Sequence, residues 1–590
     1  MKFKYLPLFI LPVLLLTSCD SLFGPQTQGI ELEAYDLDRV KKSNNQRLSD
    51  GYLTSINAKF IKGQQYIPYI TLQQYASLYE SHFDEDVKSE VSNSALGSTW
   101  IIEKGEETCF ICAFDYINRE ISMAGSIEYV FSEDDETRDL KALNYGLKTD
   151  GKSEMLSDKN YATYNYGTYN FKYIYTNGQH YFPLGLFDIT FSDCSGLYFT
   201  YNYKHIYSTR DVDTYSTYTF LEDNREYTFD SQMLSQKEHN SIPAYLKEYN
   251  AKLFIYMMDN FYGLKDNKGI KSMTTYLNNK GFYNDLFASD PDTRTWAFSD
   301  SLAILDDNHT ALVSVNNTWG SSTYRTARRY GEGCRARSLL RSDLYNYRNE
   351  AYQEMGNQIS NSVAYSSDGK TALFSFDSFA FGTSSQVFES DGTIKSTAKE
   401  YDTFFKMIDV LNHIKERGTV ENVILDVSLN GGGTIGVMMK LLALISKNNS
   451  GYVGLYDDTI GQLSVYTSEV DINGDNAYDV SDCFGNDFNF YILTSDCSYS
   501  CGNAFPCIAQ AKGYAKIIGQ KSGGGECAVS IHYLPNSEYV YHSSNLHLGY
   551  YDEENKAFKG FEGGAIPDIE IELGEHSYLV DNLNNAISNA

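Results

Sequence analysis

From about residue 365 onward, short apolar stretches alternate with amphipathic ones, and this alternation restricts the fold more than any other feature of the sequence. The helix predicted over residues 401–417 places Phe404, Ile408 and Leu411 on one face and ends at Gly418. Further helices are predicted at 434–446 and 500–511, and strands at 372–376, 423–427, 488–494 and 515–519. This pattern predicts an α/β core with a parallel component over residues 365–575.

Two segments with different patterns precede this core. Residues 51–235 are rich in Tyr, Phe, Thr, Ser and Asn, and Asn177-Gly178 between two β-type stretches predicts a type I′ hairpin. Residues 240–345 have the apolar spacing of short packed helices. We therefore expect an N-terminal β-rich accessory domain, then a helical segment, then the α/β core.

The first residues predict the compartment. Lys2 and Lys4 precede an apolar run over residues 6–16, which is too short for a membrane-spanning helix and is typical of a signal peptide. The run ends in Leu-Thr-Ser-Cys19, which resembles the lipobox of bacterial lipoproteins; the alternative is an ordinary secretory signal with a chance cysteine. The resemblance implies a signal peptide at 1–18, acylation of Cys19, a flexible tether at 19–50 and an extracytoplasmic, lipid-anchored protein of the bacterial cell envelope.

Charge excludes one class of partner. The chain has 48 basic and 77 acidic residues, a formal charge of −29, whereas nucleic-acid binding needs a basic surface. The same charge argues against adhesion of the protein body to anionic lipid, so the expected membrane contact is the lipid anchor only.

Cysteine usage does not indicate a metal site or a disulfide framework. Ten cysteines include Cys19, which leaves an odd number in a long chain. Cys109 and Cys112 have the spacing of a metal or redox pair, but a second pair is missing and the flanking residues read as a strand. We therefore expect no metal and no cofactor.

Three polar loops carry residues suited to catalysis. Residues 426–433 follow a predicted strand and end in three glycines, whose N–H groups can approach a ligand closely. Residues 494–503 join a strand to a helix and place Ser500 at the junction, where a serine is either an exposed nucleophile or a plain N-cap, as Ser498 is as well. His309, in the turn at 305–310, is a candidate general base, although an isolated histidine is more often structural.

Together these loops resemble one family, the tail-specific (C-terminal processing) proteases and their tricorn-core relatives, over residues 245–575. Residues 426–433 are similar to its Asp-Leu-Arg-x-Asn-x-Gly-Gly motif, and residues 498–503 lie where the family has Ser-Ala-Ser-Ala-Ser-Glu, so Ser500 matches the nucleophile. Residues 306–310 look like the Asp-x-His-Thr/Ser motif, and residues 515–519 and 565–569 resemble the two later motifs. The resemblance implies a crotonase/ClpP-like ββα core.

The sequence departs from the family in ways that bear on the mechanism. The lysine base of the processing proteases falls on Gly525, with Lys521 nearby but out of register, so the resemblance favours His309 as the base, as in tricorn-type members. The motif arginine is Ser428 and the alanine after the nucleophile is Cys501. A convincing PDZ module is missing between His309 and residue 374, so tail selectivity does not carry over.

The resemblance implies acyl transfer from a peptide or protein substrate. His309 takes the proton of Ser500, and the N–H groups of Cys501 and Gly432 bind the oxyanion. Glu562 is the candidate that orients the imidazole, with Asp307 or Glu526 as alternatives. Glu562 could equally be a solvated charge in a loop with no catalytic role.

Two other functions are compatible with these residues. The first is a catalytically silent lipoprotein of the same fold that binds peptide or another ligand. The second is a thiol enzyme that uses Cys501 as its nucleophile.

Overall fold

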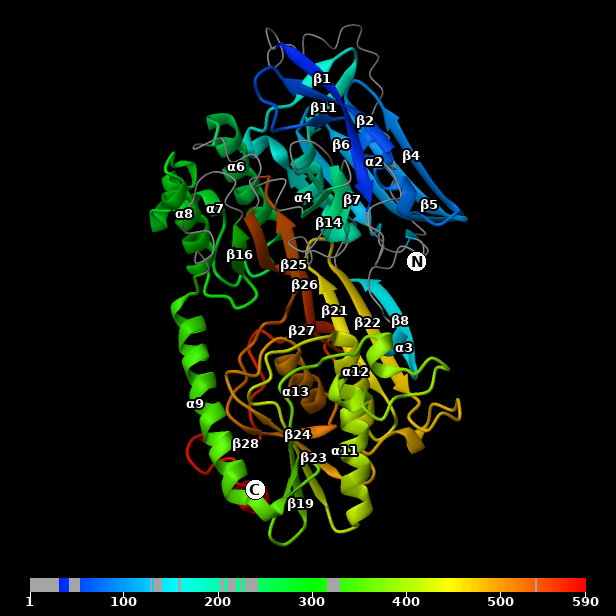
Figure 1. Cartoon of the computed structure of the whole chain (residues 1–590), viewed down its shortest axis with the longest axis vertical. Helices are drawn as coiled ribbons and strands as arrows, with labels where there is room; N and C mark the ends of the chain where they lie inside the picture. The colour runs from blue at the N-terminus through cyan, green and yellow to red at the C-terminus, as the bar shows by residue number, and fades with distance from the viewer. Residues whose placement is uncertain are drawn as a thin grey trace.

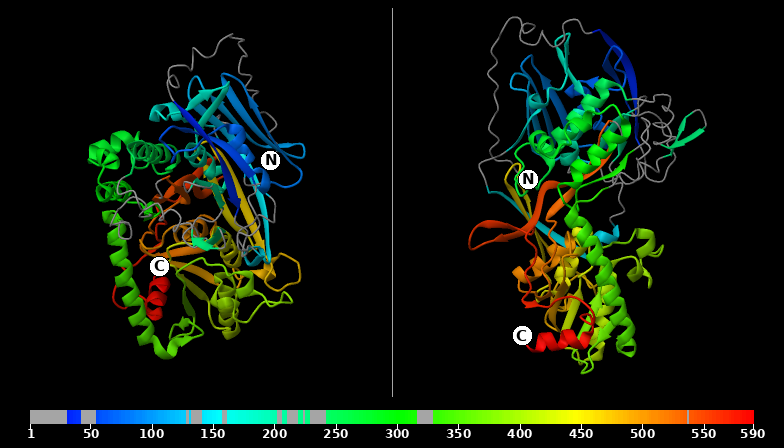
Figure 2. Two further views of the ribbon diagram at one scale, coloured as in Figure 1. Left: turned by 45° about the horizontal axis from the view of Figure 1, so that its top comes forward. Right: turned by 90° about the vertical axis from the view of Figure 1, so that its left-hand side faces the viewer.

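The computed structural model describes residues 31–41, 54–127, 130–131, 141–156, 161–201, 206–209, 219–222, 225–228, 242–315, 329–535 and 538–590. The molecule is elongated, with the N-terminal strands at one end and the α/β core at the other (Figure 1). The helix α9 (Glu332–Met355) runs along the side of the core (Figure 1), and the C-terminus lies far from the N-terminal strands (Figure 2).

The core is built on a seven-stranded sheet in the order β17-β18-β19-β20-β23-β24-β28. Strands β19, β20, β23, β24 and β28 are parallel, and β17 and β18 form an antiparallel edge. The bounds are β17 (Ile359–Ser360), β18 (Val363–Tyr365), β19 (Thr371–Ser375), β20 (Asn422–Asp426), β23 (Asn489–Thr494), β24 (Ala515–Gly519) and β28 (Ile569–Glu570). The predicted α/β core with a parallel component is confirmed.

Helices cover both faces of this sheet because alternate residues of its strands point to opposite sides. Val423 and Leu425 pack in one cluster with α11 (Thr403–Arg417), α12 (Ile435–Ile445) and α13 (Cys501–Ala511). Ile424 packs in the other cluster with α9 (Glu332–Met355) and α14 (Val580–Ser588). Small elements complete this part: η8 (Gly356–Gln358), α10 (Ser384–Val387), η9 (Ala398–Glu400) and η10 (Val480–Asp482).

A second sheet joins the core to the rest of the molecule. Its strand order is β16-β26-β21-β22-β8, and β25 and β27 also pair with β26. The bounds are β8 (Leu147–Met155), β16 (Ala311–Val315), β21 (Gly451–Asp457), β22 (Gln462–Val470), β25 (Cys527–Tyr533), β26 (Glu538–Asp552) and β27 (Ala557–Gly560). Figure 1 shows β8 beside β22, at a distance from the other N-terminal strands.

The N-terminal half contains two further sheets and a buried helix, α4 (Leu184–Ser195). One sheet has the order β10-β11-β3-β2-β1-β13-β12 and the other β4-β5-β6-β7-β9. The bounds of the first are β1 (Leu32–Lys41), β2 (Thr54–Ile61), β3 (Tyr69–Ile70), β10 (Ile174–Thr176), β11 (Gln179–Pro183), β12 (Tyr198–Tyr201) and β13 (Ile206–Thr209). Those of the second are β4 (Val87–Asn93), β5 (Gly97–Lys104), β6 (Glu107–Asp115), β7 (Glu120–Gly125) and β9 (Ala162–Asn165).

The remaining elements are short or helical. They are α2 (Leu72–Ser77), η2 (Glu80–His82), α3 (Lys141–Asn144), η5 (Tyr166–Tyr169), the pair β14 (Thr219–Glu222) and β15 (Arg225–Thr228), α6 (Ala244–Phe261), α7 (Met273–Lys280), η7 (Asn284–Phe287) and α8 (Pro291–Ala303).

The predicted hairpin is present. Strands β10 and β11 pair antiparallel with Thr176 opposite Gln179, and the two residues between them, Asn177 and Gly178, have φ values of 52° and 75°. Two consecutive positive φ angles are those of a type I′ turn.

Three of the expected segments pair or pack differently in the structure. Strand β1 lies within the segment expected to be a tether at 19–50, because its residues pair with β2 and β13. Strand β8 lies within the expected accessory domain at 51–235 but pairs with β22 of the core. In the segment at 240–345, the helices α6, α7 and α8 share one hydrophobic cluster with the N-terminal strands, whereas α9 packs against the core sheet.

The predicted signal peptide and lipid-anchored Cys19 lie outside the described part of the chain, which begins at residue 31. Among the described residues, none of the helices combines the length and the hydropathy needed to cross a bilayer. The nine described cysteines are free thiols, and Cys109 and Cys112 lie on β6.

Candidate active site

Ser500 occupies a sharp turn between β23 and α13. Its backbone angles are φ 57° and ψ −129°, a region that residues with a Cβ rarely adopt. Its N–H donates to the Gly524 carbonyl at 3.0 Å, and its carbonyl accepts the Asn503 and Ala504 N–H groups of the first helical turn. Hydrogen bonds on both sides hold the residue in this conformation, which is typical of a functional position rather than of a plain N-cap.

The loop that contains Gly432 and Gly433 lies so close to Ser500 and Phe379 that a side chain at either glycine would collide with them. Gly432 has φ 111°, and a Cβ at this position would lie 2.6 Å from the Ser500 Cβ and 2.9 Å from its Oγ. Gly433 has φ 140°, and its Cβ would collide with the Phe379 backbone at 2.5 Å. Both glycines are therefore required for the loop to pack beside the serine.

The two predicted oxyanion donors differ in availability. The N–H of Gly432 donates to Oδ1 of the buried Asn430 at 2.8 Å and is occupied in this conformation. The N–H of Cys501, the first residue of α13, donates to none of the acceptors in the described part of the chain, as expected for the start of a helix. The roles of Cys501 and Gly432 stay predictions, and that of Gly432 requires exchange of its present acceptor.

His309 lies in the turn between α8 and β16, against the residue before the serine. The rings of His309 and Tyr499 meet edge to face with centroids 4.9 Å apart. Burial lowers the pKa of His309 below its ordinary value, against the opposing effects of the Asp307 charge and the Cys527 backbone. The imidazole is therefore neutral at neutral pH, the form that a general base needs.

His309 and Ser500, both in the described part of the chain, are close in the fold but are not hydrogen-bonded to each other. The Ser500 Oγ has no hydrogen-bonded partner among the described residues, and the buried Nδ1 of His309 has none either. Catalytic hydrogen bonds are often long without substrate and shorten when it binds, so this geometry leaves proton transfer open.

Asp307 joins three segments through its buried carboxylate. Its Oδ1 accepts the His309 N–H at 3.0 Å and the Tyr499 hydroxyl at 3.1 Å. Its Oδ2 accepts the hydroxyls of Thr310 and Ser543, each at 2.7 Å. A carboxylate has about four lone-pair sites, so Asp307 has no capacity left to orient the imidazole ring of His309.

Glu526 and Glu562 hold each other in a reciprocal arrangement. Oε2 of Glu562 accepts the N–H groups of Gly525 and Glu526 at 3.0 and 3.1 Å, and Oε2 of Glu526 accepts the Glu562 N–H at 2.6 Å. The other oxygen of Glu526 contacts His547 Nδ1 at 2.8 Å. Glu526 is therefore fully engaged, whereas Oε1 of Glu562 has no hydrogen-bonded partner among the described residues.

The Glu562 carboxyl borders an open pocket of about 440 Å³. Burial raises its pKa, and the charges of Asp307 and Glu526 act in the same direction. Two other residues of the lining accept hydrogen bonds from the Arg337 guanidinium, Asp496 at 3.0 Å and the Gly523 carbonyl at 3.2 Å. The pocket is lined by Leu340, Asp496, Gln520, Lys521, Ser522, Gly523 and Glu562.

Cys501 does not have the properties of a nucleophile. Its side chain is 2% exposed, and its Sγ lies 3.1 Å from the Gly433 carbonyl. Burial raises the pKa of the thiol to about 12, so the reactive thiolate does not form at neutral pH. These properties argue against the thiol enzyme.

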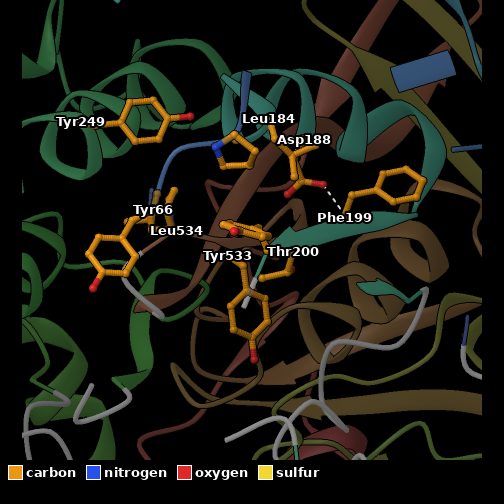
Figure 3. A pocket seen from close by; sticks show the side chains of 12 residues that line it. Tyr66, Leu184, Asp188, Phe199, Thr200, Tyr249, Tyr533 and Leu534 are labelled. Atoms are coloured by element: carbon orange, nitrogen blue, oxygen red, sulfur yellow. Dashed lines mark hydrogen bonds between the residues drawn. The ribbon is translucent and has the colours of Figure 1, made fainter. Parts of the chain in front are cut away.

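A second pocket lies between the N-terminal half and the tip of β25 (Figure 3). It is lined largely by aromatic side chains, and its acidic group is Asp188 of α4, which accepts the Phe199 N–H at 2.5 Å. Burial raises the pKa of Asp188 to about 8. Its lining contains neither serine nor histidine, so this pocket is separate from the candidate active site.

Sequence reasoning identified the nucleophile loop, the glycine loop and the histidine turn, but it missed Tyr499. Tyr499 is nearly buried, contacts the His309 ring and is bonded to Asp307. Its signal in the sequence was a bulky aromatic residue at a motif position where the resembled family has alanine.

A strained serine at the start of a helix, a glycine loop against its side chain and a neutral imidazole against the preceding residue are features typical of a serine hydrolase site. Residues 390–571 match the model of peptidase family S41. This part of the chain is therefore similar to peptidase family S41, whose members are serine peptidases.

Curated proteins give no match to this chain. Among solved structures, a proposed peptidase from Parabacteroides merdae ATCC 43184 is 18% identical, with a TM-score of 0.40, over 58% of this chain and 96% of that one. Mature CPAF bound to lactacystin is 11% identical, with a TM-score of 0.35, over 58% of this chain and 98% of that one. The tricorn protease is 11% identical, with a TM-score of 0.32, over 95% of this chain and 58% of that one.

The strain at Ser500 predicts an unusual order of stability between two variants that both lack the hydroxyl. Ser500→Gly relieves the positive φ, whereas Ser500→Ala keeps the strain, so the glycine variant should be more stable by about 1 kcal/mol. Urea unfolding of both variants measures this difference. At the exposed Ser338, inside α9, the same pair should show the opposite order, because alanine is the better helix former. An alanine variant at 500 as stable as the glycine variant contradicts the strain.

Proposed function

We propose that this chain is a serine endopeptidase that acts outside the cytoplasm, with Ser500 as nucleophile and His309 as general base. The observation that carries the proposal is the strained Ser500 beside Gly432, with the His309 ring against the preceding residue. The match of residues 390–571 to peptidase family S41 supports the same chemistry. The substrate is a peptide or a protein.

The reaction proceeds by acyl transfer. The Ser500 Oγ attacks the carbonyl carbon of the scissile bond while His309 accepts the hydroxyl proton. The proton then passes to the amine nitrogen as the peptide bond breaks, which leaves an acyl ester on Ser500. A water molecule, activated by the same imidazole, hydrolyses the ester and restores the hydroxyl.

Glu562 is the group that we propose to orient His309. The alternatives are engaged elsewhere, since Asp307 accepts four hydrogen bonds and Glu526 binds His547 and the Glu562 N–H. Glu562 has a spare carboxylate oxygen, and His309 has a buried Nδ1 without a partner. The His309 Nδ1 is buried without a partner, so a hydrogen bond from it to the spare oxygen of Glu562 would stabilise the site.

The oxyanion is proposed to bind the N–H groups of Cys501 and Gly432. The Cys501 N–H also benefits from the positive end of the α13 dipole. The Gly432 N–H becomes available when the oxyanion, which is a stronger acceptor than an amide oxygen, replaces Asn430 Oδ1.

We further propose that the core is of the crotonase/ClpP-like ββα type and that the protein is held at the bacterial cell envelope by a lipid on Cys19. The parallel order of β19, β20, β23 and β24 supports the first proposal. The Leu-Thr-Ser-Cys sequence after a short apolar run supports the second.

The catalytic assignment predicts how a fluorophosphonate probe, which labels reactive serines, will behave. Ser500→Ala should abolish labelling, and His309→Ala should lower peptide hydrolysis at least ~100-fold with the fold intact. Glu562→Gln should lower kcat about 10-fold or more, whereas Cys501→Ala should keep labelling. An unlabelled wild-type protein indicates the silent binder, and labelling that needs Cys501 indicates the thiol enzyme.

The lowered pKa of His309 predicts the pH dependence of hydrolysis. The base must be neutral, and burial keeps it neutral at lower pH, so kcat/KM should fall only below pH 6.5. Asp307→Asn removes a charge that raises this pKa, so the acidic limb should move to still lower pH. His576→Gln, at an exposed position, should leave the profile unchanged. A wild-type limb above pH 6.5 contradicts the assignment.

The lipid anchor predicts the fate of a Cys19 variant in a bacterial host. Wild-type protein should incorporate an alkyne-tagged fatty acid and sediment with membranes, whereas Cys19→Ala should do neither. Cys109→Ala, which changes a thiol on β6, should behave as wild type. Acylation that persists in the Cys19 variant excludes this anchor.

A further inference from the structure

Tyr499 occupies a position where a smaller side chain would leave the active site unsupported. It precedes Ser500 and is 7% exposed. Its ring and that of His309 meet edge to face, with centroids 4.9 Å apart. The guanidinium of Arg337 lies 5.0 Å from the centre of the same ring. A large aromatic side chain is thus enclosed between the base and a cation directly beside the nucleophile.

The Tyr499 ring also fills the space next to Gly525, the position at which the processing proteases have their lysine base. Gly525 has φ 81°, and a Cβ at this position would lie 2.5 Å from the Tyr499 ring. A lysine there cannot coexist with the ring in its present place. The tyrosine and the glycine are therefore complementary, and the pair leaves the base role to a residue outside the loop that carries Gly525.

The hydroxyl of Tyr499 connects the nucleophile loop to the histidine turn. It donates to Asp307 Oδ1 at 3.1 Å, and the same oxygen accepts the His309 N–H at 3.0 Å. Between the described residues 305–310 and 494–503, this is the one hydrogen bond that the structure contains. One carboxylate oxygen therefore holds the backbone of the base and the neighbour of the nucleophile at a fixed separation.

We propose that Tyr499 is a positioning residue, whose hydrogen bond to Asp307 fixes the His309 imidazole beside Ser500. The proposal rests on the proposed function, since it assigns Tyr499 a role in bringing that base to that nucleophile. Tyr499 itself makes and breaks no bond with the substrate. Its ring packs against the His309 imidazole. Its hydroxyl, bonded to Asp307, prevents the histidine turn from moving away from the loop that carries the serine.

The experiment compares two variants that each remove one hydroxyl bonded to Asp307. Tyr499→Phe keeps the ring contact with His309 but breaks the connection between the loops. Ser543→Ala removes a 2.7 Å bond to the other carboxylate oxygen and leaves that connection intact. Tyr499→Phe should lower kcat about 10-fold with KM within about 2-fold of wild type, and Ser543→Ala should keep kcat within about 2-fold.

A second measurement reports the position of His309 without depending on turnover. In protein with ¹³C-labelled histidine, the His309 ring signal, assigned with His309→Gln, should shift or broaden in Tyr499→Phe and stay unchanged in Ser543→Ala. Thermal unfolding of both variants shows whether the fold is retained. If Tyr499→Phe has the same kcat and the same His309 signal as the wild-type protein, the positioning role is overturned.

The two measurements also separate this inference from the proposed function. If wild-type protein is not labelled by a fluorophosphonate but the His309 signal still changes in Tyr499→Phe, the peptidase assignment fails and the positioning contact stands. If wild-type protein is labelled and hydrolyses peptide while Tyr499→Phe equals it in both measurements, the positioning role alone fails.

Discussion

The arrangement of the site depends on the parallel pairing of β20 with β23. In this register Asp426 lies opposite Leu493, so both strands end at the same edge of the sheet and the loops that follow them emerge side by side. One loop is the glycine turn that ends at Gly433, and the other carries Ser500. The contact between Gly432 and the Ser500 side chain follows from this register, since a shift by one residue would turn each strand's side chains to the opposite face. The position agrees with the general rule that sites in open α/β sheets lie beyond the carboxyl ends of the strands.

The histidine reaches this edge by a different route, through the second sheet. Strand β16, which begins two residues after His309, pairs with the long strand β26, and the backbone N–H of Ser543 on β26 donates to the Thr310 hydroxyl. The turn that carries the base is thus fastened to β26 on one side and to Tyr499 on the other. Because β22 of the same sheet also pairs with β8 from the N-terminal half, the strands that support the base connect the two ends of the molecule.

The sequence predicted the elements of the core well because each one is encoded locally. The helix over 401–417 has an apolar face, and the structure has it at Thr403–Arg417; the strand at 515–519 was predicted at the residues where it occurs. Ser500, Gly432 and His309 could be proposed because motif order indicates which loops meet. The pairing of β8 with β22 and the bond between Tyr499 and Asp307 join residues that are far apart in the chain, and no local pattern specifies such partners. The tether was overestimated because β1 is polar at alternate positions and obtains its apolar contacts only from the assembled sheet.

The acidic groups around His309 give an electrostatic reason for its use as the base. Burial keeps the free imidazole neutral, while the charge of Asp307 acts in the opposite direction and favours the imidazolium. In the proposed reaction His309 takes the serine proton, and the charge of Asp307 favours the imidazolium that forms. The His309 imidazole is therefore neutral before the reaction. The imidazolium that follows proton transfer is the form that the charge of Asp307 stabilises. His547, whose pKa is raised to about 12 by its contacts with Asp458, Cys527 and Glu526, fixes the Glu526 carboxylate that accepts the Glu562 N–H.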